Sequence, residues 1–204
     1  MKVILLILCV CLFITRQVNG QSTNISGGLN HTLFLCPQGK VFAWGDNSAG
    51  QLGMPDSVED EIIPTEVAGL DSVKAIDAGK AYFSLVLKTD GSVWAWGQNT
   101  SGQLGNPWFC RNIVCDFSTY PVRVAGGETG HTYLEGCIAI AGGYNHAYAL
   151  LDNGKIVAWG DNSYSQFGNG SSISSVNPSY VLINDSTPLS NVIAICAGAF
   201  DGFA

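Results

Sequence analysis

Residues 27–53 read GGLNHTLFLCPQGKVFAWGDNSAGQLG, and this stretch decides the fold because the chain repeats it twice more. Residues 79–105 read GKAYFSLVLKTDGSVWAWGQNTSGQLG, and residues 142–168 read GGYNHAYALLDNGKIVAWGDNSYSQFG. The three blocks are each 27 residues long and align without a gap. A partial fourth copy occupies residues 195–204. Block starts spaced 52 to 63 residues apart indicate an array of similar structural units.

Each block has the chemistry of a β-hairpin. In the first block, two β-prone runs at residues 31–36 and 40–44 flank Gln38-Gly39. A Gly after Gln, Asp or Asn recurs at this place in every block, which predicts a tight turn. The second run of each block ends in a tryptophan, and one large aromatic per unit is typical of a shared core. We therefore predict three buried tryptophans: Trp44, Trp96 and Trp159.

The inserts between the blocks supply further strands. Paired apolar runs predict strands at residues 62–67 and 73–76, 120–124 and 136–140, and 180–183 and 192–195. Four strands per period of this length is the pattern of a propeller blade. We predict an all-β β-propeller of four-stranded antiparallel blades, with about three and a half blades within residues 21–204.

The shared pattern is Ala-Gly-x-x-x-His-Thr, then Asp-Gly-x-Val-x-Ala-Trp-Gly-x-Asn-x-x-Gly-Gln-Leu-Gly. It resembles the repeat of the regulator of chromosome condensation family, over nearly all of residues 25–204. The resemblance implies a propeller that typically has seven blades. Three blades and a fragment cannot close such a ring, so we expect either a piece of a longer protein or two copies that pair as a homodimer.

The resemblance does not transfer one function, because one fold hosts many functions. It implies guanine-nucleotide exchange on a small GTPase for the founding member, and light sensing through Trp and Arg clusters for plant photoreceptors. The corresponding segments here, residues 27–31 and 142–146, contain neither Trp nor Arg, which argues against light sensing. Secreted relatives, such as bacterial β-lactamase-inhibiting propellers and plant receptor-kinase ectodomains, bind other molecules through loops on the propeller faces.

The first twenty residues have the layout of a secretory signal peptide. Met1-Lys2 is followed by an apolar run at residues 3–14, and Val18 and Gly20 precede a plausible cleavage before Gln21. The alternative is an uncleaved membrane anchor, but the run is short against the ~20 residues that cross a bilayer. We therefore predict a signal peptide at residues 1–20, a secreted, extracellular protein, and no membrane span after cleavage.

Charge and cysteines agree with that compartment. After cleavage, seven basic residues face 16 acidic ones, which excludes a basic nucleic-acid surface. Cysteines in an oxidising compartment tend to pair. Cys110 and Cys115 flank a short loop and form the favoured disulfide, Cys137 and Cys196 could form another, and Cys36 is left over. The spacing of cysteines and histidines predicts no metal site.

Five asparagines lie in glycosylation sequons, which a eukaryotic secretory pathway would read. Asn169 and Asn184, in polar loops, are the favoured acceptors. The complete set of candidates is Asn24, Asn30, Asn99, Asn169 and Asn184.

Residues that recur at fixed repeat positions are interpreted as structural. His31 and His146 share a position that holds Phe83 in the second block, so we expect hydrogen bonds that fix neighbouring turns rather than catalysis. Asp46 and Asp161 follow the Trp-Gly of their blocks and are expected to cap turns. Catalytic motifs such as Gly-x-Ser-x-Gly or a P-loop do not occur, so we predict neither an enzyme nor a bound cofactor.

Candidate binding residues come from departures from the repeat. The longest insert, residues 106–120, reads NPWFCRNIVCDFSTY. Aromatic residues and Arg dominate interface hot spots, and functional loops are carried by rigid scaffolds. The alternative is that these side chains only cover the blade edge. The candidates are Trp108, Phe109, Arg111, Phe117 and Tyr120.

A second candidate is the acidic loop at residues 56–61, for which a solvated loop is the favoured interpretation. Taken together, the sequence predicts a secreted recognition module that binds a protein or glycan partner through face loops. The alternatives are an exchange factor of a small GTPase, if the chain is intracellular, and a structural segment of a larger surface protein.

Overall fold

The fold is described by a computed structural model that covers residues 24–55, 58–109, 116–184 and 186–204. The predicted signal peptide at residues 1–20 and the Cys110–Cys115 disulfide lie outside these residues. Within them, no helix has the length and apolar character needed to cross a membrane.

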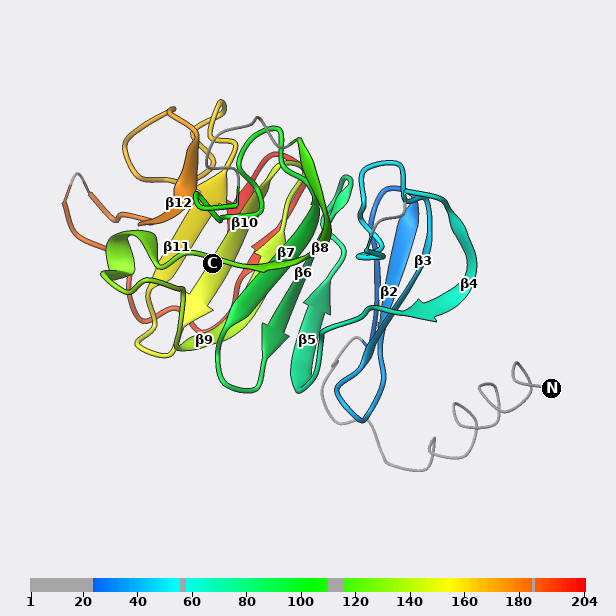
Figure 1. The fold of residues 1–204 in the computed structure, drawn as a ribbon. Helices are drawn as coiled ribbons and strands as arrows, with labels where there is room; N and C mark the ends of the chain where they lie inside the picture. The colour runs from blue at the N-terminus through cyan, green and yellow to red at the C-terminus, as the bar shows by residue number, and fades with distance from the viewer. Residues whose placement is uncertain (1–23, 56–57, 110–115, 185) are drawn as a thin grey trace.

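Three four-stranded antiparallel sheets follow one another along the chain, which confirms the all-β prediction (Figure 1). We call them blades 1 to 3, and a two-stranded partial blade comes after them. Blade 1 consists of β1 (Ile25–Gly27), β2 (His31–Leu35), β3 (Val41–Gly45) and β4 (Glu61–Glu66). Blade 2 consists of β5 (Val73–Asp77), β6 (Phe83–Lys88), β7 (Val93–Gln98) and β8 (Phe117–Arg123). Blade 3 consists of β9 (Cys137–Gly142), β10 (His146–Leu151), β11 (Ile156–Gly160) and β12 (Ser175–Tyr180), and the partial blade of β13 (Cys196–Ala197) and β14 (Gly202–Phe203).

The predicted hairpin turns are present at the middle of each blade. Gly39, Gly91 and Gly154 have φ values of 76°, 81° and 75°, which a residue with a Cβ rarely adopts. The flanking strands β2 and β3, β6 and β7, and β10 and β11 pair in register. The block therefore encodes its own central hairpin, as its sequence predicts.

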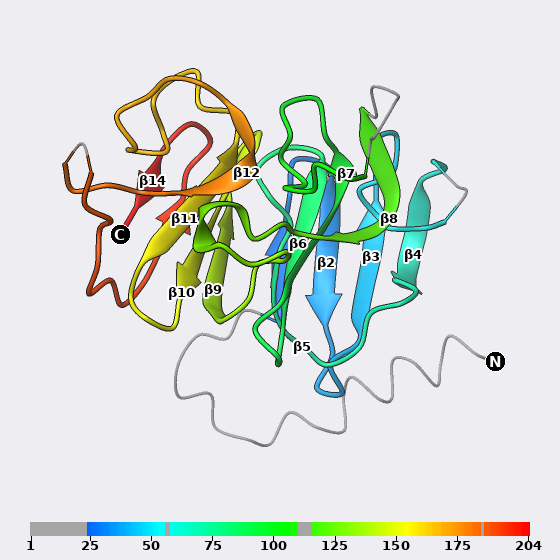
Figure 2. The same cartoon turned by 60° about the vertical axis from the view of Figure 1, so that its left-hand side comes forward.

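The strands alternate up and down, so each blade has two ends. We call the end that carries the β1–β2, β3–β4 and equivalent connections the loop side, which lies at the top in Figure 2. The opposite end, with the β2–β3, β6–β7 and β10–β11 turns, is the hairpin side. The connection from β8 to β9 carries a short 3-10 helix, η1 (Gly127–Thr129).

The core lies between successive blades rather than within one. Leu33 and Val41 of blade 1 pack with Val86 and Trp96 of blade 2. A second cluster joins blade 2 to Ala147, Ala149, Val157 and Trp159 of blade 3, and a third joins blade 3 to the partial blade. In blade 1, β2 alternates buried and half-buried residues, whereas β6 and β10 are buried at nearly every position because a blade packs on each of their faces.

The tryptophans at the repeat position contact the preceding blade. Trp96 and Trp159 are fully buried, and their indole Nε1 groups donate to the backbone carbonyls of Gln51 at 2.8 Å and Gln103 at 3.0 Å. Trp44 is only half-buried, which corrects the prediction of three core tryptophans. The reason is its position, because blade 1 has no preceding blade among the described residues.

The repeated histidines also connect neighbouring blades. His31 Nε2 lies 3.0 Å from Ser84 Oγ, which itself donates to the Gln51 carbonyl, so His31 is the donor. His146 Nε2 donates to the Asp201 carbonyl at 3.3 Å, in the partial blade. Burial lowers the pKa of His31 to about 4, which keeps this imidazole neutral at physiological pH.

Two sequence expectations in the last third of the chain are wrong. The outer strand of blade 3 is Ser175–Tyr180, not residues 180–183, because Gly160 pairs with Ser175 and Leu182 bridges Pro188 in a local turn. The next strand begins at Cys196 instead of residue 192.

The expected Cys137–Cys196 disulfide is absent. Cys36, Cys137 and Cys196 are unpaired thiols. Cys137 is buried at the start of β9, while Cys196 is exposed on β13. Burial raises the pKa of the Cys137 thiol to about 12, so this group is an inert apolar filler rather than a reactive cysteine.

Candidate binding surface

The long insert begins with an asparagine that fixes its direction. Asn106 Oδ1 accepts hydrogen bonds from the backbone N–H groups of Trp108 and Phe109, both at 2.9 Å. Its Nδ2 donates to the Arg123 carbonyl at 2.8 Å, at the end of β8. The first residues of the insert are therefore held against blade 2 before the chain reaches residues 110–115, which lie outside the description.

The two aromatic residues that follow Asn106 have different surroundings. Phe109 packs against the core between blades 2 and 3 and makes an edge contact with Tyr120, with ring centroids 5.7 Å apart. Trp108 packs on Tyr133 in the same manner at 5.6 Å, yet 39% of it stays exposed. Phe109 thus covers the blade edge, whereas Trp108 presents a ring to solvent.

The other three predicted binding residues differ in where they lie. Phe117 and Tyr120, on β8, are 42% and 49% exposed. Arg111 lies outside the described residues, so the proposed grouping of all five side chains stays a prediction.

Arg123 and Tyr133 extend the surface around Trp108. The Arg123 guanidinium lies 4.7 Å from the Tyr133 ring centroid and donates from Nη2 to Glu135 Oε1 at 3.1 Å. Tyr133 is thus contacted by a cation and by an indole, and its position is set by the bridge between Ala125 and Tyr133. A Trp, a Tyr and an Arg in contact are the side chains enriched at binding hot spots.

A shallow groove runs beside Trp108, between blades 2 and 3. One wall is the β8–β9 connection, whose η1 packs on β12, and Gly127 leaves no room for a Cβ beside the Pro178 carbonyl oxygen. Glu128 Oε2 accepts a hydrogen bond from the Tyr180 backbone N–H at 2.8 Å and secures the connection. The groove is lined by Trp108, Ala125, Gly127, Glu128, His131, Thr132 and Asn177.

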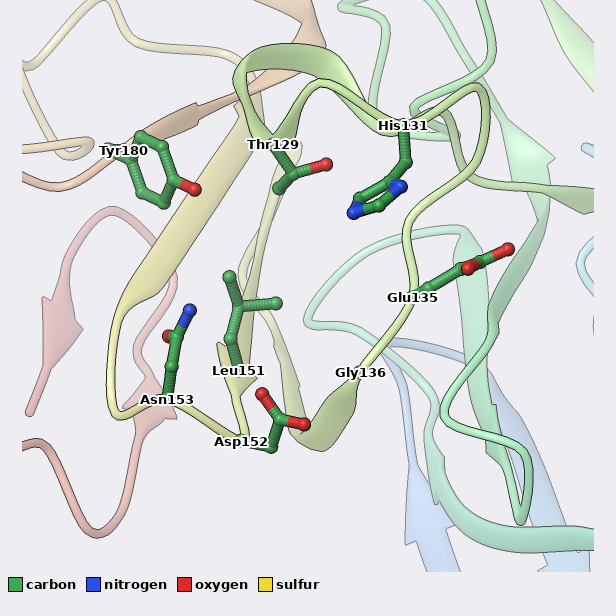
Figure 3. Close-up of a pocket in the computed structure, with 8 residues that line it drawn as sticks. All are labelled: Thr129, His131, Glu135, Gly136, Leu151, Asp152, Asn153 and Tyr180. Atoms are coloured by element: carbon green, nitrogen blue, oxygen red, sulfur yellow. The ribbon is translucent and has the colours of Figure 1, made fainter.

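A second hollow adjoins the first at His131 and opens toward the hairpin side. Figure 3 shows His131, Thr129 and Tyr180 around it, with Asp152 and Asn153 of the β10–β11 turn below. The Glu135 side chain points away from Asp152 and Asn153 in this view, and it forms an ion pair with Arg123. The two hollows together form one polar and aromatic groove, which we call the interblade groove.

Sequence reasoning missed most of this groove. His131, Tyr133 and Glu128 belong to the β8–β9 connection, which is longer than the equivalent β4–β5 connection and carries η1. Because these residues lie outside the repeated blocks, an alignment of the blocks could not predict their positions. The usable signal was the unusual content of that insert, which holds Tyr, His and two Glu within residues 126–136.

The acidic candidates serve local structure. Asp46 Oδ1 accepts from the Ser48 N–H at 2.8 Å, and Asp161 Oδ1 accepts from the Ser163 N–H at 3.0 Å, so both cap turns. In the acidic loop, Asp60 Oδ1 accepts from the Asn47 N–H at 3.0 Å. Residues 56–57 lie outside the description. Among the described residues, His, Cys, Asp and Glu do not gather in a group that could hold a metal ion.

The five sequons differ in accessibility. Asn24, Asn30 and Asn184 are exposed, whereas Asn99 and Asn169 are half-buried. Asn169 Oδ1 accepts from the Ser171 N–H at 3.1 Å, and Asn99 Oδ1 accepts from the Leu104 N–H at 3.2 Å. Asn184 is therefore more accessible than Asn169, and the use of either sequon stays a prediction.

The blades and their tryptophan–glutamine contacts define the chain as a series of β-propeller repeats. The sequence matches the family described as "Regulator of chromosome condensation (RCC1) repeat" at residues 38–87 and 90–150. A second description of the same repeat matches residues 23–51, 73–103 and 137–166. The chain belongs to the RCC1 repeat family.

Similar sequences come from much longer proteins. The chain is 35% identical over 147 residues to "Probable E3 ubiquitin-protein ligase HERC6" of Homo sapiens, covering 70% of this chain and 13% of the relative. It is 27% identical over 204 aligned residues to "Ultraviolet-B receptor UVR8" of Arabidopsis thaliana, covering 79% of this chain and 46% of that protein. The chain thus spans less than half the length of either relative.

Solved structures share the fold. Yeast RCC1 (Prp20), crystallised with Kap60, superposes with a TM-score of 0.63 at 23% identity, over 91% of this chain and 42% of that one. Human WBSCR16 gives a TM-score of 0.62 at 20% identity, over 81% and 39%. These likenesses establish a partial propeller of RCC1 type.

Proposed function

We propose that this chain is a secreted recognition module that binds a protein partner through the interblade groove, with Trp108 as the central contact. The observation that carries the proposal is the edge-to-face contact of Trp108 with Tyr133, with Arg123 beside it. Rigid aromatic side chains lose little conformational entropy on binding and supply large contact areas. Polar groups of Glu128, His131 and Asn177 line the same groove and can provide a hydrogen-bonding rim.

The scaffold supports a binding role without requiring catalysis. The groove lies on connections between two packed blades, so its shape is fixed by the core beneath it. Yeast RCC1, which shares this fold, has been crystallised bound to another protein, Kap60. We propose a non-enzymatic role, because the capping aspartates and the repeated histidines already have structural tasks.

Capture from extracellular fluid tests the groove. The mature wild-type chain, Trp108→Ala and Phe117→Ala are immobilised, and retained proteins are quantified by mass spectrometry. Phe117 is the matched control, because it is an aromatic of similar exposure on the same blade that does not line the groove. We expect a partner retained by the wild type and by Phe117→Ala but weakened at least tenfold by Trp108→Ala, in the range of hot-spot losses.

Equal capture by Trp108→Ala and the wild type would refute the groove as the binding site. Loss of capture on enzymatic removal of glycans from the partner would replace the protein partner with a glycan, the other ligand class that the sequence predicts.

Secretion is tested separately by the intact mass of the native protein from culture medium, before and after glycan removal. We expect a chain that begins at Gln21 and that loses mass on deglycosylation at sequons such as Asn184. Retention of the whole protein inside the cell, with residues 1–20 still attached, would contradict secretion. The exchange-factor hypothesis would then replace the proposed one.

A further inference from the structure

Three aromatic side chains meet on the loop side, where blade 3 adjoins the partial blade. The rings of Tyr144 and Phe200 stack with centroids 5.6 Å apart and an interplanar angle of 26°. Tyr164 meets Phe200 edge-on, also at 5.6 Å. Tyr164 is 71% exposed and Phe200 55% exposed, so the cluster stands at the surface instead of filling the core.

The cluster is a local departure from the repeat. Tyr144 and Phe200 occupy the repeat position that holds Leu29 in blade 1 and Ala81 in blade 2. Tyr164 occupies the position that holds Ala49 and Ser101. Since blades 1 and 2 fold with small or aliphatic residues there, the fold itself does not require aromatic rings at these positions.

Backbone hydrogen bonds hold the cluster in place. The Tyr144 N–H donates to the Ala199 carbonyl at 2.9 Å, which fixes the two loops that carry Tyr144 and Phe200. The Tyr164 N–H donates to Gln166 Oε1 at 2.9 Å. A surface whose rings are positioned before a ligand arrives loses less entropy on binding.

Two carboxylates flank the aromatic cluster. Asp201 follows Phe200 directly, and Asp161 Oδ2 lies 3.5 Å from the same Gln166 side chain that holds Tyr164. Burial lowers the pKa of His146, which lies two residues after Tyr144, and the negative charges of both carboxylates oppose that shift. Partial burial opposes the ionisation of Asp161, but hydrogen bonds from Ser163 outweigh it and lower the pKa of this carboxyl.

Among the described residues, the loop side as a whole is also negatively charged. Of the described lysines and arginines, only Lys80 lies on the loop side. Three ion pairs, Lys40–Glu66, Lys88–Asp71 and Arg123–Glu135, use cations of the hairpin side. The acidic residues of the loop side are Asp46, Glu59, Asp60, Glu61, Asp116, Asp161 and Asp201, in addition to Asp77 at the end of β5.

We propose that Tyr144, Tyr164 and Phe200, with Asp161 and Asp201 beside them, form a docking site for an arginine or lysine side chain of a basic protein segment. An aromatic face attracts a cation through its quadrupole, and a neighbouring carboxylate supplies the opposite charge. The acidic loop side would attract the rest of a basic segment over longer range. This site does not share residues with the interblade groove, so neither proposal depends on the other.

A basic peptide tests the site directly. The probe is a fluorescent nona-arginine peptide, titrated with the mature full chain and followed by anisotropy. The variants are Tyr164→Ala, Tyr164→Phe and Ile173→Ala. Ile173 is the matched control, because it is a 76% exposed apolar residue of the same β11–β12 connection outside the cluster. All three changes leave the net charge unaltered.

We expect Tyr164→Ala to weaken nona-arginine binding about two- to fivefold, while Tyr164→Phe and Ile173→Ala bind as the wild type does. Raising the salt from about 0.1 M to about 1 M should weaken all complexes, because the Debye length falls from about 10 Å to about 3 Å. Unchanged binding by Tyr164→Ala would show that net charge alone captures the peptide and would overturn the proposal. Equal affinity for an uncharged Gly-Ser peptide of the same length would overturn it as well.

Discussion

Trp159 and Trp44 occupy the same repeat position, yet Trp159 is fully buried and Trp44 is only half-buried. Trp159 packs on blade 2, donates to the Gln103 carbonyl and is approached by Gly105. Trp44 lies at the equivalent place in its strand and pairs across the hairpin with Thr32, as Trp159 pairs with Ala147. The difference shows that the tryptophan belongs to the junction between two blades rather than to the blade that carries it.

The rest of blade 1 agrees with this interpretation. On β2 and β3, Leu33 and Val41 face blade 2 and are buried, whereas Phe34 and Phe42 alternate with them and are half-buried. Their counterparts in blade 2 include Val86, which is fully buried in the junction with blade 1. The central strands β6 and β10, which have described blades on both sides, are buried on both faces, whereas β2 of blade 1 is buried on one face.

The largest expected effect breaks a complete junction. Trp159→Ala removes a fully buried indole and its hydrogen bond to Gln103. Loss of a large core side chain costs about 3–5 kcal/mol, from lost burial and the cavity that remains. Urea denaturation of the mature chain, followed by circular dichroism, measures the change in the free energy of unfolding. A loss below about 1 kcal/mol would contradict the role given to this junction.

The second effect overfills the same junction from its other side. Gly105 has a φ of 65°, and a Cβ there would lie 2.8 Å from Trp159 Nε1. Gly170 has a φ of 73° but open space around it, so it separates backbone strain from crowding. We expect Gly170→Ala to lower stability by about 1 kcal/mol, and Gly105→Ala by about 1–3 kcal/mol more. The same denaturation experiment measures both free energies of unfolding. Equal losses would mean that the junction accommodates the added methyl group of Gly105→Ala without further destabilisation.

The third effect acts on the junction between blades 1 and 2 through pH. Burial lowers the pKa of His31 to about 4, against 6.5 for an unfolded histidine. Because the unfolded chain binds this proton first, the stabilisation is complete above pH 6.5 and is lost as the pH falls toward 4. The shift corresponds to about 3 kcal/mol.

His31→Phe is the matched variant, since blade 2 carries Phe83 at this position. We expect its unfolding free energy to depend less on pH between 6.5 and 4 than that of the wild type. Burial also lowers the pKa of His146, so part of the dependence should remain. Identical pH profiles for the two proteins would refute the assignment of this proton to His31.

The contrast between repeat and departure also explains what the sequence could predict. The central hairpins follow from local chemistry, with Gly39, Gly91 and Gly154 at positive φ and β-prone runs on both sides. Blade number and strand order follow from the spacing of the blocks. The burial of Trp44 could not be predicted in this way, because it depends on a neighbour and not on the block itself.

The binding surface was less accessible to prediction for the same reason. Trp108 was identified by composition, but its contact Tyr133 is 25 residues further along and outside any repeated block. The misplaced β12 shows the other limit, because its Ser-Val-Asn-Pro-Ser-Tyr sequence has weak β propensity and is recruited by pairing with β11. In both cases a contact with another segment of the chain, and not the local sequence, determines the structure.

The smallest expected effect tests the comparison at the open junction. Trp44→Ala removes the same side chain as Trp159→Ala, but from a position that is half-buried instead of fully buried. Because part of the Trp44 ring already lies in solvent, less burial is lost, and we expect a cost of about 2 kcal/mol. Acrylamide quenching supplies a second measurement, since the fluorescence of Trp44 should be quenched far more readily than that of Trp96 or Trp159. If Trp44→Ala costs as much as Trp159→Ala and Trp44 resists quenching, then a partner surface covers blade 1 in solution, and the two junctions are equivalent after all.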